Sequence, residues 1–326
     1  MSAVVTVESL SKQFRYPERG RGLLGAVFPE HILIDAVADV SFEIGRGERG
    51  AIIGPNGAGK STTLKMLTGV LEPSSGRAEV AGLIPWLDRK ALAYRIGVVF
   101  GQRSQLWSEL PARQSFELLA RIYDQERVAF GRRLSELAGR FGLDDFIDQP
   151  VRRLSLGQRM RCEIVASLLH GPELLFLDEP TIGLDITAKA AIRDFVLEQA
   201  RDAGLTVVLT SHDTRDVELV CERVIVVNRG RIVIDQPTEE LRRRFVGRKV
   251  VTIQSTAPEI ALELEGVVRR SHEPHRTVLE VESRRVRVEQ VIAAAVAHGG
   301  IEDITIEDPP MEEVIREIYA SGLGQA

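Results

Sequence analysis

The sequence lacks long apolar runs and is poor in cysteine. No run approaches the roughly 18 to 20 apolar residues that cross a bilayer. The first residues, MSAVVTVESLSKQF, lack the basic region and the continuous apolar core of a secretory signal. The two cysteines, Cys162 and Cys221, do not have metal-ligand spacing, so we expect buried thiols in a reducing compartment. We therefore expect neither a membrane-spanning nor a disulfide-rich protein, and any action at a membrane would need a partner chain.

The charge balance shows no excess of basic residues. The 42 Lys and Arg residues are outnumbered by 47 Asp and Glu residues, which leaves a net charge of −5. Proteins that bind nucleic acid usually carry a basic surface, so we expect no nucleic-acid partner. The length of 326 residues is enough for one large domain and a small one.

The hydrophobic pattern alternates between strands and helices. Short apolar runs such as RGAIIG, RIGVVFG and ELLFLDEP predict buried strands, and longer segments between them have helical spacing. This alternation predicts an α/β fold with a parallel sheet covered by helices. A mainly helical stretch at about 103–170 predicts an inserted helical subdomain.

A second, smaller domain is expected near the C-terminal end. The segment 249–326 reads β-α-β-β-α-β-α, with its first helix at PEIALELE and its last at PMEEVIREIYA. The first six elements fit a ferredoxin-like α+β sandwich. We therefore predict two domains, 1–248 and 249–326.

The segment GPNGAGKST matches the pattern G-x-x-x-x-G-K-[ST] between a predicted strand and a predicted helix, the context of a P-loop NTPase. Its glycines let backbone N–H groups face phosphate oxygens. Lys60 would reach the β- and γ-phosphates, and Ser61 would hold Mg²⁺. The residues expected to bind the nucleotide here are Gly54, Pro55, Asn56, Gly57, Ala58, Gly59, Lys60, Ser61 and Thr62.

The segment ELLFLDEPT is an apolar strand that ends in two carboxylates. Alone, such a run is more often a plain transition from strand to loop. Beside a phosphate loop, Asp178 is expected to hold Mg²⁺ through water. Glu179 is expected to accept a proton from an attacking water, as a general base.

A second turn suited to an anion, LSLGQ, runs into the helix-like segment after it. Together GPNGAGKST, LSLGQ, LLFLDEPTIGLD and TSH, in this order, resemble the nucleotide-binding domain of ABC transporters over about residues 4–245. The resemblance implies ATP and Mg²⁺ as ligands and ATP hydrolysis as the reaction. It also implies a head-to-tail homodimer, or a dimer with a paralogous subunit, in which LSLGQ of one chain meets the ATP of the other.

The resemblance also assigns roles to single residues. Gln102 matches the glutamine that senses Mg²⁺ and faces the membrane partner, and His212 matches the histidine that contacts the γ-phosphate. Asp185 matches the loop that crosses the dimer interface. Phe14 matches the aromatic residue that stacks on adenine, with Tyr16 as the alternative. Across the dimer, the expected contacts to the partner's ATP come from Ser155, Gly157 and Gln158.

One position departs from the family pattern. Leu156 stands where the family usually has glycine, which puts details of the turn in doubt but not the use of ATP. The signature segment, the long early loop 15–31 and the tail resemble bacterial exporter ATPases of the drug- and sodium-efflux type. We therefore expect integral membrane permease subunits as partners and a location at the cytoplasmic face of the membrane.

Two other functions remain open at this point. Importer ATPases of the methionine type also carry a ferredoxin-like tail, which binds a regulatory ligand there. A soluble ABC ATPase acting on DNA or ribosomes is the alternative from another class. The segment HEPH, 272–275, invites a metal interpretation, but an exposed loop is favoured because no third ligand lies nearby in the sequence.

Overall fold

We describe a computed structural model of the chain. It describes residues 3–17, 31–101, 103–211, 213–243, 248–258, 260, 262, 264–283, 285–309, 313 and 315. The chain forms two compact units, one up to Asp235 and one from Gln236 onward. The domain limits expected from the sequence, 1–248 and 249–326, stay a prediction, because a compact unit need not fold as a separate domain. No helix in the described ranges is long and apolar enough to span a membrane.

The first unit is built on a six-stranded sheet in the order β5-β6-β7-β3-β8-β9. The four pairs from β5 to β8 are parallel, as the alternating pattern predicted. Strands β6 and β7 are buried along almost their whole length, as expected for strands covered on both faces. The strands are β3 (Arg49–Ile53), β5 (Ile96–Phe100), β6 (Leu174–Asp178), β7 (Thr206–Ser211), β8 (Arg223–Asn228) and β9 (Arg231–Pro237).

An antiparallel sheet of three strands completes the core of this unit. It has the order β2-β1-β4, from β1 (Ala3–Pro17), β2 (His31–Gly45) and β4 (Ser75–Val80). Its buried side chains form one hydrophobic cluster with helix α2 (Lys60–Leu67) and with strand β6. Burial on both sides therefore holds α2 in place, and the loop in front of α2 with it.

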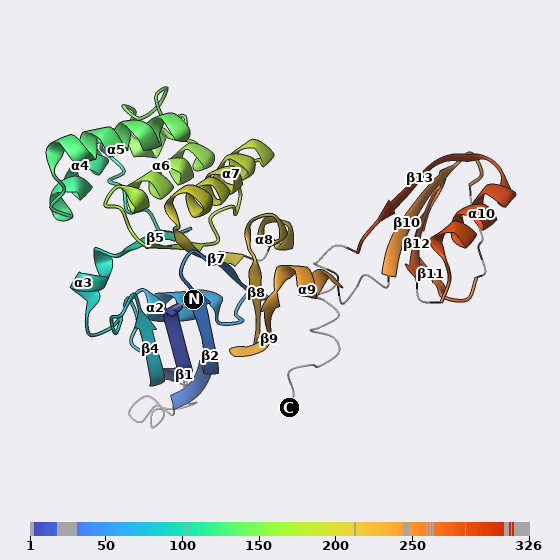
Figure 1. Ribbon diagram of the computed structural model, residues 1–326, viewed down its shortest axis with the longest axis horizontal. Coiled ribbons are helices and arrows are strands. Elements are labelled where there is room, and N and C mark those ends of the chain that lie inside the picture. Colours follow the sequence, from blue (N-terminus) through green and yellow to red (C-terminus); the bar gives the residue numbers. More distant parts are fainter. Residues whose placement is uncertain are drawn as a thin grey trace, which may run out of the picture. The chain divides into compact units, whose positions relative to one another are not determined.

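Helices α4, α5, α6 and α7 form a group on one side of the six-stranded sheet (Figure 1). Helices α4 and α5 both pack against α6, and α6 packs against α7. The stretch expected to be helical thus contains α4, α5 and α6. The bounds of these four helices are α4 (Ala112–Ile122), α5 (Arg127–Arg140), α6 (Leu156–Leu168) and α7 (Ile186–Ala203). This unit also contains α3 (Arg89–Ala93), the 3₁₀ turn η1 (Val151–Arg153) and α8 (Thr214–Val220).

Both cysteines are buried thiols, as expected. Burial raises the pKa of Cys162 and of Cys221 to about 12. Neither thiol is therefore a thiolate at neutral pH, which makes both unreactive.

The second unit contains an antiparallel sheet in the order β11-β12-β10-β13. Its core includes Val251, Leu279 and Val281 from the sheet and Val291 from helix α10. In the segment HEPH, His272 and Glu273 end β11, and Pro274 and His275 form the turn to β12, in which both residues are exposed. The elements are α9 (Thr238–Arg243), β10 (Arg248–Ser255), β11 (Val267–Glu273), β12 (Arg276–Glu282), α10 (Val288–His298) and β13 (Ile301–Glu307).

The helix expected at PEIALELE is wrong for the described residues of that segment, none of which is helical. Ile260 is buried in the core of the second unit, and Leu262 and Leu264 pack against the same core. Apolar residues at every second position have the period of an extended chain, not the 3.6-residue period of a helix. Most of the helix expected at PMEEVIREIYA lies outside the described residues.

Candidate functional site

The loop 54–59 joins the end of β3 to the first turn of α2. Gly59 has φ 106°, and a Cβ atom there would lie 2.5 Å from the carbonyl oxygen of Ala36. A Cβ atom on Gly54 would lie 2.3 Å from the carbonyl oxygen of Val227. Neighbouring backbone thus requires glycine at both ends of the loop, and at Gly59 the left-handed conformation requires it as well. The result is a helix N-terminus whose free N–H groups open onto the loop, which is an arrangement suited to phosphate.

Lys60 begins α2 and is almost completely buried, with 5% of its surface exposed. Its ammonium donates to the carbonyl oxygens of Gly54, at 2.8 Å, and of Pro55, at 3.3 Å. The same nitrogen lies 3.5 Å from Oε1 of Glu179. The ammonium therefore sits against both the phosphate-type loop and the second carboxylate.

Asp178 is the last residue of β6 and is held by two hydroxyl groups. Its Oδ1 accepts hydrogen bonds from Oγ of Ser61, at 3.0 Å, and from Oγ1 of Thr210, at 2.6 Å. A serine hydroxyl beside a carboxylate is the hard oxygen donor set that Mg²⁺ prefers. The residues present therefore fit this ion.

Glu179 has φ 52°, in the left-handed region that non-glycine residues rarely occupy. Its N–H donates to the carbonyl oxygen and to Oγ1 of Thr210, at 3.0 Å and 3.1 Å. In an extended strand, consecutive side chains point to opposite faces. Because the backbone turns at Glu179, its carboxylate and that of Asp178 line the same cleft.

That cleft has a volume of about 680 Å³ and contains the phosphate-type loop. Phe14, the aromatic residue expected to stack on adenine, lines it together with Ile34 of the neighbouring strand, its partner in the β1–β2 register. The side chain of Tyr16 lies outside the described residues. The predicted site residues that the structure brings together here are Phe14, Asn56, Gly57, Ala58, Gly59, Lys60, Ser61, Thr62, Asp178 and Glu179.

The turn LSLGQ lies outside the lining of this cleft. Ser155 caps α6: its Oγ accepts from the N–H of Gln158, and Oε1 of Gln158 accepts from the N–H of Ser155. Leu156 is 39% exposed, and its Cδ2 would lie 3.0 Å from a Cβ atom placed on Gly183. Within a single chain, the two turns predicted to bind anions therefore do not line the same cleft.

Of three further predicted site residues, the structure describes Asp185 but not Gln102 or His212. Asp185 caps α7, because its Oδ1 accepts from the N–H of Ala188 at 2.8 Å. Gln102 and His212 lie outside the described residues. Gly101 and Arg103, on either side of Gln102 in the sequence, both line the cleft.

Thr210 is the site residue that sequence reasoning missed. It belongs to the segment TSH, in which only the histidine was singled out. What could have indicated it is its position at the carboxyl end of β7. In the parallel pairing of β6 and β7, Thr210 is the partner of Asp178. Register between strands separated by a whole helix cannot be read from local sequence alone.

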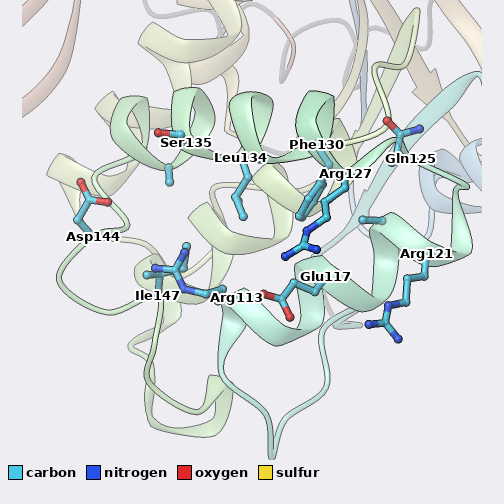
Figure 2. A pocket seen from close by; sticks show the side chains of 13 residues that line it. Arg113, Glu117, Arg121, Gln125, Arg127, Phe130, Leu134, Ser135, Asp144 and Ile147 are labelled. Carbon is cyan, nitrogen blue, oxygen red and sulfur yellow. The ribbon is translucent and has the colours of Figure 1, made fainter.

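A second cleft, of about 650 Å³, lies between α4 and α5 (Figure 2). Arg113 and Glu117 of α4 line it on one side, and Phe130 and Leu134 of α5 on the other (Figure 2). None of the described motif residues lines this cleft. The chemistry predicted from the sequence therefore belongs to the first cleft.

Known proteins with similar sequences share the motifs from which this site is built. The sequence pattern described as "ABC transporter" matches residues 37–182, which include the loop, the LSLGQ turn and both carboxylates. The ABC transporter ATP-binding protein NatA of Bacillus subtilis is 34% identical over 209 residues, which cover 64% of this chain and 85% of NatA. The daunorubicin resistance ATP-binding protein DrrA3 of Streptomyces coeruleorubidus is 32% identical over 287 residues, which cover 86% of this chain and 89% of DrrA3.

A solved structure shows the same fold. It is a dimeric ATP-binding cassette in a post-hydrolysis state, bound to ADP and Pi. It matches with a TM-score of 0.61 at 26% identity, over 72% of this chain and 98% of the cassette. The resemblance drawn from the motifs, to ATP-binding subunits of drug- and sodium-efflux type, is confirmed.

Proposed function

This chain belongs to the ABC transporter family as an ATP-binding subunit that hydrolyses ATP, and from this membership we propose that it drives export through separate membrane permeases. Two observations support export. The relatives include a daunorubicin resistance protein, matched over most of both chains. The motif resemblance also points to efflux ATPases. We place the protein at the cytoplasmic face of the membrane, bound to permease subunits.

One observation carries the proposed chemistry: Lys60, Ser61, Asp178 and Glu179 line one cleft. Lys60 would bind the β- and γ-phosphates, and Phe14 would stack on adenine. Ser61 and Asp178, with Gln102 by resemblance, would hold Mg²⁺, which supplies charge neutralisation at the phosphates. Glu179 would accept the proton of the attacking water, while His212 would contact the γ-phosphate. Positioning and charge stabilisation are most of what phosphoryl transfer requires.

We further propose that two copies close head to tail around two ATP molecules. The LSLGQ turn, which lies outside the cleft of its own chain, would complete the cleft of the partner through Ser155, Gly157 and Gln158. Asp185 would lie at the interface. The solved relative described as a dimer supports this arrangement. A γ-phosphate shared between two chains would hold the dimer closed, and its hydrolysis would release it.

The helices α4, α5 and α6 are proposed to act as the subdomain that transmits closure to the permease. For the second unit we propose a ferredoxin-like fold with a role in supporting the dimer. Its sheet order β11-β12-β10-β13, antiparallel throughout, supports that fold. The described residues between β10 and β11, where the fold would have a helix, are not helical, which weighs against it.

The proposal is tested with Glu179→Gln and, as a matched control, Glu117→Gln on the exposed surface of α4. We expect Glu179→Gln to bind ATP, to lose nearly all turnover and to elute as a dimer with ATP. Glu117→Gln should behave like the wild type. Normal turnover in Glu179→Gln would overturn the site assignment.

Copurification tests the partners. Multi-pass membrane proteins captured from detergent-solubilised cells would support the transporter role. Capture of only ribosomal or DNA-bound proteins would overturn it in favour of a soluble ABC ATPase.

A further inference from the structure

Thr210, at the carboxyl end of β7, touches both carboxylate residues of the cleft. Its side chain is completely buried, with 0% exposed. Its Oγ1 lies 2.6 Å from Oδ1 of Asp178 and 3.1 Å from the backbone nitrogen of Glu179. Nothing that the motifs imply gives this residue a task.

The chemistry of a hydroxyl group fixes the direction of these two bonds. A threonine hydroxyl has one proton to donate and lone pairs to accept with. The nitrogen of Glu179 can only donate, so Oγ1 accepts there and donates its own proton to Asp178. The Thr210 hydroxyl therefore donates to the carboxylate of Asp178 and accepts from the backbone of Glu179.

Removing the hydroxyl would leave the turn itself paired. The N–H of Glu179 also donates to the carbonyl oxygen of Thr210, at 3.0 Å. Oδ1 of Asp178 would keep one hydroxyl, that of Ser61, at 3.0 Å. What would be lost is the second point of attachment of the Asp178 carboxylate, and with it the restriction on how that group rotates.

We propose that Thr210 is a positioning residue for ATP hydrolysis, whose hydroxyl fixes the orientation of the Asp178 carboxylate in the cleft. The proposal rests on the roles proposed above for Asp178 and Glu179. Partners that orient metal-binding carboxylates typically account for about 10–100-fold in metal affinity or activity. The effect of Thr210 belongs in this range.

The chain provides a matched control on the same strand. Thr206, at the opposite end of β7, is equally buried, with 1% exposed. Its Oγ1 accepts from the N–H of Gly47 at 2.9 Å, away from the cleft. A threonine-to-valine change at either position removes one buried hydroxyl and keeps the shape of the side chain. The two variants therefore differ in what the hydroxyl touches.

The test compares Thr210→Val, Thr210→Ser and Thr206→Val in the full-length chain. ATPase rates are measured as a function of ATP and of Mg²⁺ concentration, with thermal unfolding recorded for each variant. We expect Thr210→Val to lower kcat by about 10–100-fold and to require more Mg²⁺ for half-maximal rate. The KM for ATP should stay within about twofold of wild type, because uniform ATP binding is unaffected. Thr210→Ser should restore the rate, and Thr206→Val should lower only the melting temperature.

The outcomes separate this proposal from the proposed site. Equal rates and equal Mg²⁺ dependence for the two valine variants, with an inactive Glu179→Gln, would overturn the role of Thr210 alone. Normal turnover in Glu179→Gln would overturn the site, and the role of Thr210 with it. If Thr210→Val does not fold, Thr210→Ala is compared with Thr206→Ala in the same assays, and equal rates would again overturn the proposal.

Discussion

The ammonium of Lys60 lies 3.5 Å from a carboxylate oxygen of Glu179, and only 5% and 19% of the two side chains are exposed. The proposed phosphate ligand and the proposed base thus form an ion pair in one cleft. Ion pairs shielded from water are screened less than those on the surface. A γ-phosphate would therefore compete with Glu179 for Lys60, and the negative charge of Glu179 would oppose its approach.

The ion pair between Lys60 and Glu179 predicts that ATP binds more tightly when the negative charge of Glu179 is removed. Glu179→Gln should bind ATP about 3–10-fold more tightly than wild type, because Lys60 loses its competitor and the repulsion of the phosphate falls. Binding is measured by calorimetry with ATP and Mg²⁺ at low temperature. Lys60→Met, as the opposite change, should weaken binding. Weaker binding by Glu179→Gln would show that the carboxylate does not compete with the phosphate.

The LSLGQ turn predicts a separation of ATP binding from dimer formation. Ser155→Arg adds bulk and charge at an exposed turn that lies outside the cleft of its own chain. It should bind ATP normally as a monomer and fail to dimerise, even in the Glu179→Gln background. Light scattering with ATP checks the mass.

A control separates bulk from loss of the helix cap. Ser155→Ala removes the cap of α6 and costs about 1 kcal/mol of stability, but it adds no bulk. It should dimerise with ATP more weakly than wild type, because it loses one contact to the partner's ATP, but far more than Ser155→Arg. A dimer of Ser155→Arg with ATP would contradict the head-to-tail arrangement.

A buried ion pair between α7 and α8 predicts a large loss of stability. Arg193 lies 3.1 Å from Oδ1 of Asp216, whose side chain is 3% exposed. Arg193→Met would leave this carboxylate buried without its cation, at a cost of about 3–5 kcal/mol in unfolding free energy.

The control for this change is Arg113→Met, at the pair with Asp148, whose side chains are 44% and 69% exposed. Exposed pairs contribute about 0–1 kcal/mol. Urea unfolding of both variants, followed by circular dichroism, measures the difference. Equal losses would show that burial does not decide the contribution.

His170 predicts a loss of stability in acid. Burial lowers the pKa of its imidazole to about 4 from the ordinary 6.5. Its Nε2 lies 3.0 Å from the carbonyl oxygen of Ile96, and its ring stacks on Tyr123. The unfolded chain binds the proton more tightly than the folded one. Stability should therefore be fully present above pH 6.5 and fall as the pH drops from 6.5 to 4.

The variant His170→Phe keeps an aromatic ring but cannot titrate. Its loss of unfolding free energy between pH 7 and pH 4.5 should be smaller than that of wild type by about 2 kcal/mol, as an upper limit. Urea unfolding at the two pH values gives both losses. His298→Phe, at an exposed histidine, should match the wild type. Identical losses for His170→Phe and wild type would contradict the prediction.

Features carried by consecutive residues were predictable. The phosphate loop needs its glycines, Lys60 and Ser61 within a few positions of one another, so the motif shows the geometry directly. The strand before Asp178 is apolar throughout, as a strand buried on both faces must be. The helix expected at 258–265 is wrong for the described residues because the core contacts come from Ile260, Leu262 and Leu264, at every second position, which is the period of an extended chain.

The sequence by itself determined the class of the protein. Its evidence was a phosphate-loop motif, two carboxylates at the end of a buried strand and a second turn predicted to bind an anion, each recognisable from consecutive residues. Only the tertiary structure decided which groups meet. Asp178 and Thr210 are 32 positions apart, and the parallel register of β6 and β7 places their side chains in contact. Lys60 and Glu179 likewise meet because β3 and β6 end at the same edge of one sheet. The physical reason is that register and strand order arise from burial of the whole sheet, which no short segment of sequence encodes.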